Sequence, residues 1–308
     1  MKRVDWKPLA VEHFEKLQPR QRVFTRDQVR RILDALRPEL RIPKSLSVER
    51  FLELLTDGGR MRQIGIPPER EGSAGPDHAD RPAYRAFERY VWGEASPYEV
   101  ALALRGGSYL SHGSAAFLHD LASSEPGEIY VNKEQSPKPV ARGTLTQEAI
   151  DRAFANQPRS SNYVFSYERR GIVLMSGKQS GALGVSPVAV PFGPPLPATG
   201  PERTLVDLTV RPAYAGGPVE VLAAYGRARE KISVGEVLRI LEKLQFVYPY
   251  HQAIGFYLER AGYSGSDLHR LRTAPRRFKF YLANRMADPK FDPAWYVYYP
   301  PELDQVDV

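Results

Sequence analysis

The hydrophobic pattern predicts two amphipathic helices near the N-terminus. In both, apolar residues fall at positions i, i+3, i+4 and i+7, the spacing of a single buried helix face. These residues are Val29, Ile32, Leu33 and Leu36 in the first helix and Val48, Phe51, Leu52 and Leu55 in the second. Thr25 and Gln28 have the spacing of a capping box, Ser47 opens the second helix, and Pro38 is expected to end the first.

A third helix is predicted before these two, over residues 9–17, and a short basic strand or hairpin follows them at residues 60–66. Three short helices followed by a basic strand or hairpin is the order of a winged helix-turn-helix. We therefore expect residues 1–66 to form a DNA-binding domain of this type.

The rest of the chain mixes both periodicities, so the predicted fold class is α+β. Residues 67–82 are polar and rich in Pro and Gly, which is typical of a linker. Beyond it we expect one domain, 83–308, that is mixed α/β over 83–215 and mainly helical over 216–308. Its expected helices are 84–92, 98–104, 114–121, one opened by Thr199 and Glu202 at capping-box spacing, 219–229, 233–244 and 250–261. Its expected strands are 128–132, 163–168, 172–175 and 188–190, with an aromatic tail that forms one or two strands or a wrap.

The charge is unevenly distributed. Residues 1–65 hold 15 Lys and Arg against 9 Asp and Glu, which is +6 of the formal net charge of +7 and leaves +1 for the other 243 residues. A local basic excess on a small folded unit is typical of a surface that meets phosphate.

The bulk composition indicates an ordinary globular protein of the reducing cytosol. Hydrophobic residues make up 42% and charged residues 26%, and there is no cysteine to form a disulfide or a Cys-ligated metal site. No stretch approaches 18 consecutive apolar residues, and the N-terminus lacks the pattern of a secretory signal. The expected localisation is cytoplasmic, without a membrane partner.

The predicted DNA contacts follow from the helix-turn-helix geometry, in which the N-terminal residues of the second helix meet base edges. Arg50 is suited to bind guanine, and the other polar residues near the start of that helix are suited to contact neighbouring bases. The basic residues on the preceding helix and on the wing are suited to bind phosphates. The set is Arg26, Arg30, Arg31, Lys44, Ser45, Ser47, Arg50, Arg60 and Arg62. The alternatives are a helical domain with solvated basic faces and a protein-docking module, and Glu49 and Glu53 on the exposed face favour these alternatives.

The middle region contains one candidate for chemistry. Gly107 and Ser108 followed by Asp120 resemble a nucleotidyltransferase arrangement, but no second carboxylate lies near Asp120. A nucleophile pair of Ser111 or Ser114 with His112 lacks a predicted strand–turn–helix elbow and an orienting acid. We expect no catalytic residue, no cofactor and no metal site, so the predicted protein is not an enzyme; a nucleotide- or phosphate-transferring enzyme remains the alternative, as does a protein-interaction scaffold that does not bind DNA.

Two further segments complete the pattern. One runs from Ser108 to Leu121 (SYLSHGSAAFLHDL) and the other from Pro201 to Leu208 (PERTLVDL), where Arg203 and Asp207 are four apart and can pair on one helix face. In this order behind a basic winged helix, they resemble the AbiEi-type antitoxin and transcriptional regulator family of bacterial abortive-infection (phage defence) systems. The resemblance spans about residues 9–261; the connection Arg37–Leu46 is longer than the tight turn usual in the family.

The resemblance implies an antitoxin of a toxin–antitoxin operon. Such a protein binds double-stranded DNA of its own promoter, at repeated half-sites, as a repressor, and counteracts a nucleotidyltransferase-like toxin encoded beside it. The DNA-binding half is also expected from the residues themselves, whereas the toxin partner is implied by the resemblance alone.

Overall fold

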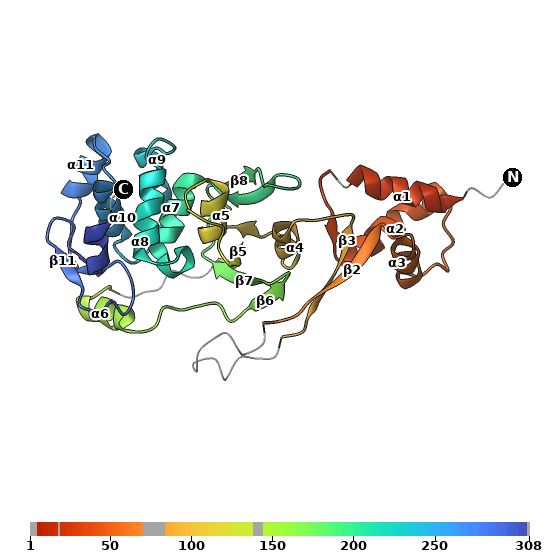
Figure 1. The fold of residues 1–308 in the computed structure, drawn as a ribbon, viewed down its shortest axis with the longest axis horizontal. Coiled ribbons are helices and arrows are strands. Elements are labelled where there is room, and N and C mark those ends of the chain that lie inside the picture. The colour runs from red at the N-terminus through yellow and green to blue at the C-terminus, as the bar shows by residue number, and fades with distance from the viewer. Residues whose placement is uncertain (1–4, 18, 70–83, 138–143, 307–308) are drawn as a thin grey trace. The chain divides into compact units, whose positions relative to one another are not determined.

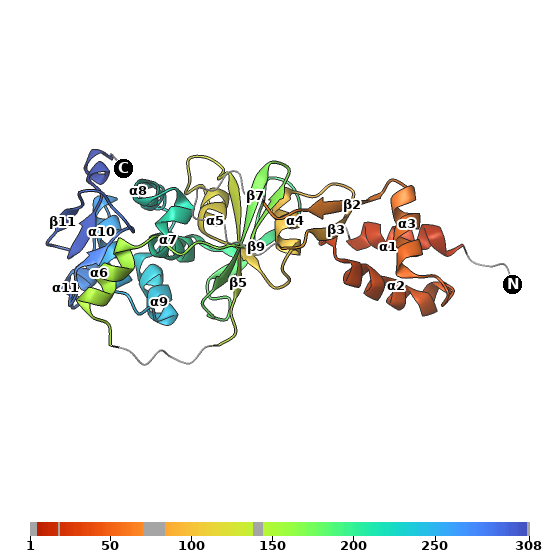
Figure 2. The same ribbon diagram turned by 90° about the horizontal axis from the view of Figure 1, so that it is seen from below.

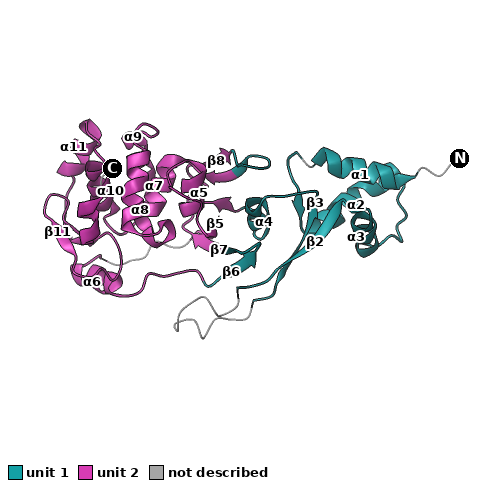
Figure 3. Ribbon diagram, viewed as in Figure 1, with its two compact units in different colours: residues 1–107, 162–172, 189–196 teal, residues 108–161, 173–188, 197–308 magenta. Residues whose placement is uncertain are grey.

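The computed structural model describes residues 5–17, 19–69, 84–137 and 144–306, and the chain divides into two compact units (Figure 3). Unit 1 consists of residues 1–107, 162–172 and 189–196, and unit 2 of residues 108–161, 173–188 and 197–308. Helices and strands occur in both units, as expected of an α+β protein. The division differs from the expected domains 1–66 and 83–308, because unit 1 takes in residues on both sides of the expected linker. Most of that linker lies outside the described residues.

Unit 1 places three helices against a small antiparallel sheet (Figure 1). The sheet has the order β1-β3-β2, with Val23 opposite Val91 and Met61 opposite Trp92. In chain order the elements are α1 (Trp6–Leu17), β1 (Val23–Phe24), α2 (Arg26–Leu40), α3 (Val48–Asp57), β2 (Met61–Ile66), β3 (Phe87–Trp92), α4 (Pro97–Ala103) and β6 (Val164–Tyr167).

The starts of α2 and α3 are fixed by side-chain caps, as the sequence predicts. The Thr25 hydroxyl accepts from the Gln28 amide at 3.1 Å while the Gln28 side chain accepts from the Thr25 amide at 2.7 Å. Ser47 caps α3 by accepting from the Arg50 amide at 3.2 Å. The expectation that Pro38 ends α2 is wrong, since the helix continues to Leu40. A proline in the last turn removes only its own N–H donor, and α2 ends where Arg41 turns left-handed at φ 53°.

The helix expected over residues 84–92 is the strand β3. Phe87, Tyr90 and Val91 have helical spacing, but β3 is the central strand of its sheet and has neighbours on both sides. Most of its side chains are buried, so their pattern does not alternate. Aromatic and β-branched residues favour such a strand.

Aromatic rings hold the core of unit 1 together. Phe14 of α1 stacks on Trp92 of β3 with ring centroids 5.0 Å apart, and it meets Phe24 of β1 edge-on at 5.4 Å. Phe51 of α3 is fully buried beside them. The stripes predicted on α2 and α3 therefore face this core, although Ile32 and Val48 are only partly buried.

Unit 2 combines part of a mixed sheet with a group of helices (Figures 1 and 2). Its strands lie in the order β7-β5-β4-β9-β8, with β4 antiparallel to β5 and parallel to β9. The elements of this first part are β4 (Tyr109–Leu110), α5 (His112–Leu118), β5 (Glu128–Glu134), α6 (Gln147–Ala155), β7 (Arg170–Gly177), β8 (Val185–Val188) and β9 (Leu196–Thr199).

The C-terminal part of unit 2 is mainly helical, as predicted. It contains α7 (Pro201–Val210), η2 (Pro212–Ala215), α8 (Pro218–Arg227), α9 (Val234–Leu244), α10 (Tyr250–Arg260), α11 (Ser266–Thr273) and η3 (Pro301–Gln305). The aromatic tail forms three short strands, β10 (Phe280–Tyr281), β11 (Lys290–Asp292) and β12 (Val297–Tyr299), in the order β10-β12-β11. The helices α6 and α11 and the strands β1, β4 and β9 were not expected, and β8 lies earlier in the chain than the strand expected over 188–190. Within the described ranges no helix has both the length and the apolar character needed to cross a membrane.

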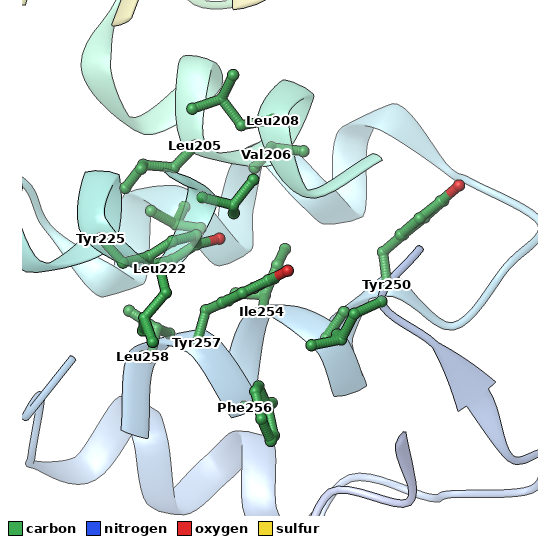
Figure 4. Close-up of a cluster of buried hydrophobic side chains, with 14 of the residues drawn as sticks. Leu205, Val206, Leu208, Leu222, Tyr225, Tyr250, Ile254, Phe256, Tyr257 and Leu258 are labelled. Atoms are coloured by element: carbon green, nitrogen blue, oxygen red, sulfur yellow. The ribbon is translucent and has the colours of Figure 1, made fainter. Parts of the chain in front are cut away.

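The core of unit 2 lies where α7, α8 and α10 meet (Figure 4). Tyr225 of α8 and Tyr257 of α10 stack there, with ring centroids 5.4 Å apart and planes 15° apart. Both rings are fully buried, and Leu205, Leu222 and Ile254 surround them without exposed surface. The three helices thus share one apolar centre.

Gly255 gives a test of this packing. A Cβ atom at Gly255 in α10 would overlap the buried indole of Trp295. We expect Gly255→Ala to lower the free energy of unfolding by about 2 kcal/mol, because overpacking outweighs the better helix propensity of alanine. Gly235→Ala in α9 is the control, since its Cβ would meet no atom closer than the Asp267 carboxylate oxygen at 3.3 Å. Urea denaturation measures both, and equal stability of the two variants would contradict the expectation.

Candidate nucleic-acid interface and buried polar cluster

All nine residues predicted to contact DNA are exposed on unit 1. They occupy the elements that the sequence assigned to them: Arg26, Arg30 and Arg31 on α2, Lys44, Ser45 and Ser47 before α3, Arg50 on α3, and Arg60 and Arg62 at β2. The Ser47 hydroxyl is engaged as the cap of α3, so it has less capacity for a base. The others keep their polar groups at the surface.

The connection between α2 and α3 is ordered by Arg37. Its guanidinium donates to the Pro43 carbonyl at 2.6 Å and to the Leu46 carbonyl at 2.7 Å. Ile42 is buried in the core beneath. Arg37 therefore shapes the seven residues between the helices, and the longer turn noted in the sequence is folded against unit 1.

Acidic residues neutralise much of the α3 surface. This helix carries Glu49, Glu53 and Asp57 against the single cation Arg50. Arg50 pairs with Glu53 at 2.7 Å, and Glu49 pairs with Arg26 of α2, which ties the first turns of the two helices together. Exposed ion pairs of this kind are worth about 0–1 kcal/mol, so a phosphate or a base can displace them at little cost.

One cation of the basic N-terminal region is not on the surface at all. Arg22 is 7% exposed and donates through two nitrogens to the Glu99 carboxylate, both at 2.9 Å. Glu99 also accepts from the Ser96 amide in the capping box of α4. The excess of positive charge available to a partner is consequently carried mainly by the residues on either side of α3, Arg41 and Lys44 before it and Arg60 and Arg62 after it, because the four Arg of α2 are offset by three acidic residues.

A second basic segment, which was not predicted, lies near the C-terminus. Residues 268–285 contain six Lys or Arg and no Asp or Glu, so the near-neutral total of the chain beyond residue 65 conceals them. Arg277 and Arg285 are exposed, and their guanidinium groups have no partner among the described residues. A charge count in short windows would have detected this segment.

The two segments that carry the family resemblance meet inside unit 2, where α5 packs against α7 (Figures 1 and 2). The predicted pair is present: Arg203 Nε donates to Asp207 Oδ1 at 2.8 Å, with Arg203 4% and Asp207 6% exposed. Arg203 Nη1 also donates to the Leu183 carbonyl at 2.9 Å. Asp207 Oδ2 is buried and has no hydrogen-bond partner in the part of the chain that the structure describes.

The loop of residues 177–184, which contains three glycines, is hydrogen-bonded to Arg203 through the Leu183 carbonyl. The Glu134 carboxylate at the end of β5 accepts from the amides of Ser180, Gly181 and Ala182 at 2.9–3.0 Å. Burial alone would raise the pKa of Glu134, but a hydrogen bond from the Ser180 hydroxyl, together with those from the three amides, holds it below its usual value. The loop thus surrounds a half-buried carboxylate in the way that such loops surround an anion.

The expectation that Ser111 and His112 lack a strand–turn–helix setting is wrong. β4 precedes Ser111 directly and α5 begins at His112, whose backbone is left-handed at φ 51°. Ser111 Oγ lies 2.9 Å from His112 Nδ1. Ser111 is fully buried, however, so the pair serves the packing of α5.

The Asp120 side chain lies at the surface. Its side chain is 90% exposed and its nearest cation, Lys231, lies 3.8 Å away. Across the described part of the chain, no three His, Asp or Glu side chains come close enough together to hold a metal ion.

His112 is expected to make stability depend on pH. Burial lowers its pKa from 6.5 to about 4, so the folded chain stays neutral there while the unfolded chain takes up a proton below pH 6.5. The stabilisation is complete above pH 6.5 and falls as the pH drops towards 4, by about 2 kcal/mol between pH 7 and 5. Denaturant unfolding of wild type and His112→Asn at both pH values isolates this contribution, because asparagine tolerates a left-handed backbone. The same drop in both proteins would contradict it.

Comparison with known proteins finds a similar fold, described below. No family model and no curated protein matches the sequence. The crystal structure of the RV2827C protein from Mycobacterium tuberculosis is similar, with a TM-score of 0.54 and 17% sequence identity over 96% of this chain and 91% of that one. At this identity the likeness concerns the fold alone.

Proposed function

We propose that unit 1 contains a winged helix-turn-helix that binds double-stranded DNA of the protein's own promoter as a repressor. The observation that carries the proposal is the connectivity of unit 1. Its order is helix, strand, helix, helix and two strands, with the first strand beside the last in the sheet β1-β3-β2. In a winged helix-turn-helix of this order, α3 would serve as the recognition helix and β2 and β3 as the strands of the wing.

The charge distribution limits how α3 can meet DNA. Three carboxylates on ten residues would repel phosphates if the whole helix lay in the groove. Only its first turn, with Lys44 and Ser45 before it and Arg50 on it, suits base edges. Arg30 and Arg31 of α2 suit phosphates on one side, and Arg60 and Arg62 suit them on the other.

We further propose that the protein is the antitoxin of a toxin–antitoxin operon in abortive infection. The support is the resemblance carried by residues 108–121 and 201–208, together with the packing of these two segments as α5 and α7. In this proposal unit 2 serves a nucleotidyltransferase-like toxin in the cytoplasm, and the protein itself is not an enzyme. Asp120, which is exposed and lies 3.8 Å from Lys231, gives the enzymatic alternative no support.

Charge variants of α3 test the DNA-binding proposal. Arg50→Ala should weaken binding to the protein's own promoter by about 1–3 kcal/mol if Arg50 reads a base. Glu53→Gln should tighten binding, because it releases Arg50 and removes a charge that repels phosphate. Arg31→Ala should weaken binding to promoter and unrelated DNA alike and reduce the salt slope by about 1. Fluorescence anisotropy with labelled duplexes at several salt concentrations measures all three.

The control for these variants is Arg277→Ala in the second basic segment, which should leave promoter binding unchanged. An affinity that does not respond to salt, or equal affinity for promoter and unrelated duplex under competition, would contradict specific regulation.

The antitoxin proposal is tested by co-expression with the product of the adjacent gene. Expression of that gene alone should arrest growth, and co-expression of the full chain should restore it. Arg50→Ala should still restore growth, because neutralisation is assigned to unit 2. Absence of toxicity from the adjacent gene, or failure of the full chain to relieve it, would contradict the antitoxin role.

A further inference from the structure

Unit 2 contains a cleft of about 450 Å³ beside the contact of α5 with α7. Its walls come from α5, the loop 121–127 that follows it, β5, α7, η2 and α8, and most of its lining residues are small. Gly113 shows why they must be: a Cβ atom there would lie 2.8 Å from the Tyr214 carbonyl oxygen and 3.2 Å from the Tyr130 ring. The segment from Ser108 to Leu121 therefore supplies both the α5 helix and the hollow beside it.

Two tyrosine rings form one side of the cleft. Tyr130 and Tyr214 have ring centroids 5.1 Å apart with planes tilted by 40°. His112 lies behind them and meets Tyr214 edge-on at 5.3 Å. The faces of tyrosine rings are negative and attract cations. Arg211, outside the cleft, already lies 5.9 Å from the Tyr214 centroid.

Two carboxylates complete the lining, and none of the lining residues is Lys, Arg or His. Glu128 Oε2 accepts from the Tyr130 hydroxyl at 2.7 Å, which holds this carboxylate against the ring. Glu220 is half-buried, and its side chain has no hydrogen bond or ion pair with any described residue. A partly desolvated carboxylate without a partner favours a positively charged ligand.

We propose that this cleft binds a guanidinium or ammonium group, with Glu128 and Glu220 supplying negative charge and Tyr130 and Tyr214 supplying ring faces. The volume suits the end of an arginine or lysine side chain or a short polyamine. Both sources share the same chemistry. The site lies wholly within unit 2 and does not depend on DNA binding by unit 1.

The test is isothermal titration calorimetry of the full chain with three probes. N-acetylarginine amide and spermidine represent the side-chain and polyamine sources, and N-acetylcitrulline amide is the neutral match to arginine. We expect the cations to bind with an affinity that falls as salt increases, and citrulline to show no binding. Tighter binding of the arginine probe identifies a side chain as the source, and tighter binding of spermidine a polyamine. Equal binding of citrulline and arginine overturns the proposal.

Isosteric variants locate the site. Glu220→Gln should weaken binding of the cations about tenfold, because it removes one charged hydrogen-bond acceptor, and Glu128→Gln with Glu220→Gln should abolish it. Glu230→Gln, at an exposed glutamate that does not line the cleft, should have no effect. Thermal unfolding confirms that each variant is folded. An unchanged affinity in the folded Glu220→Gln variant also overturns the proposal.

Discussion

The buried pair of Arg203 and Asp207 is the interaction on which the arrangement of unit 2 depends. Removing one partner of such a pair leaves an uncompensated charge inside the protein, at a cost of about 3–5 kcal/mol. Arg203 also holds the Leu183 carbonyl, and the loop that contains Leu183 encloses the Glu134 carboxylate at the end of β5. A single side chain on α7 thus fixes the loop, and through it the strand whose other end forms the wall of the tyrosine-lined cleft.

Less of the positive charge of unit 1 is available to a partner than its net charge implies. Arg22 is neutralised in the interior by Glu99, and Arg37 is used to shape the connection before α3. The remaining cations lie on α1, α2, β2 and the loops, whereas α3 itself has a net negative charge. In the DNA-binding role proposed for unit 1, affinity would therefore come from the elements that flank α3, and specificity from only its first turn.

The sequence predicts well what depends on local chemistry. The stripes of α2 and α3, the capping box at Thr25 and the pairing of Arg203 with Asp207 are all present, because each involves residues within one or two helical turns. Thr199 illustrates the limit. Its hydroxyl bonds to Thr204 instead of capping α7, since the buried contact wins over the local motif.

What the sequence does not reveal depends on residues far apart in the chain. β3 has helical spacing and becomes a strand only because β1 and β2 lie on either side of it. The cleft needs Glu128 from β5 and Glu220 from α8 at once, and no spacing relates them. The basic segment 268–285, by contrast, could have been predicted from the sequence. The net charge of all residues beyond 65 does not reveal it, because acidic residues elsewhere in that stretch cancel its charge.

The route of the chain through unit 1 has a consequence for its synthesis. Residues 162–172 and 189–196 return to this unit after the chain has begun unit 2. During translation, the first hundred residues emerge long before the segments that complete their fold, so unit 1 cannot reach its final form until residue 196 has left the ribosome. In the proposed function, repression would then begin only with molecules whose synthesis is well advanced. A fragment cut after β2 would lack the central strand of the sheet.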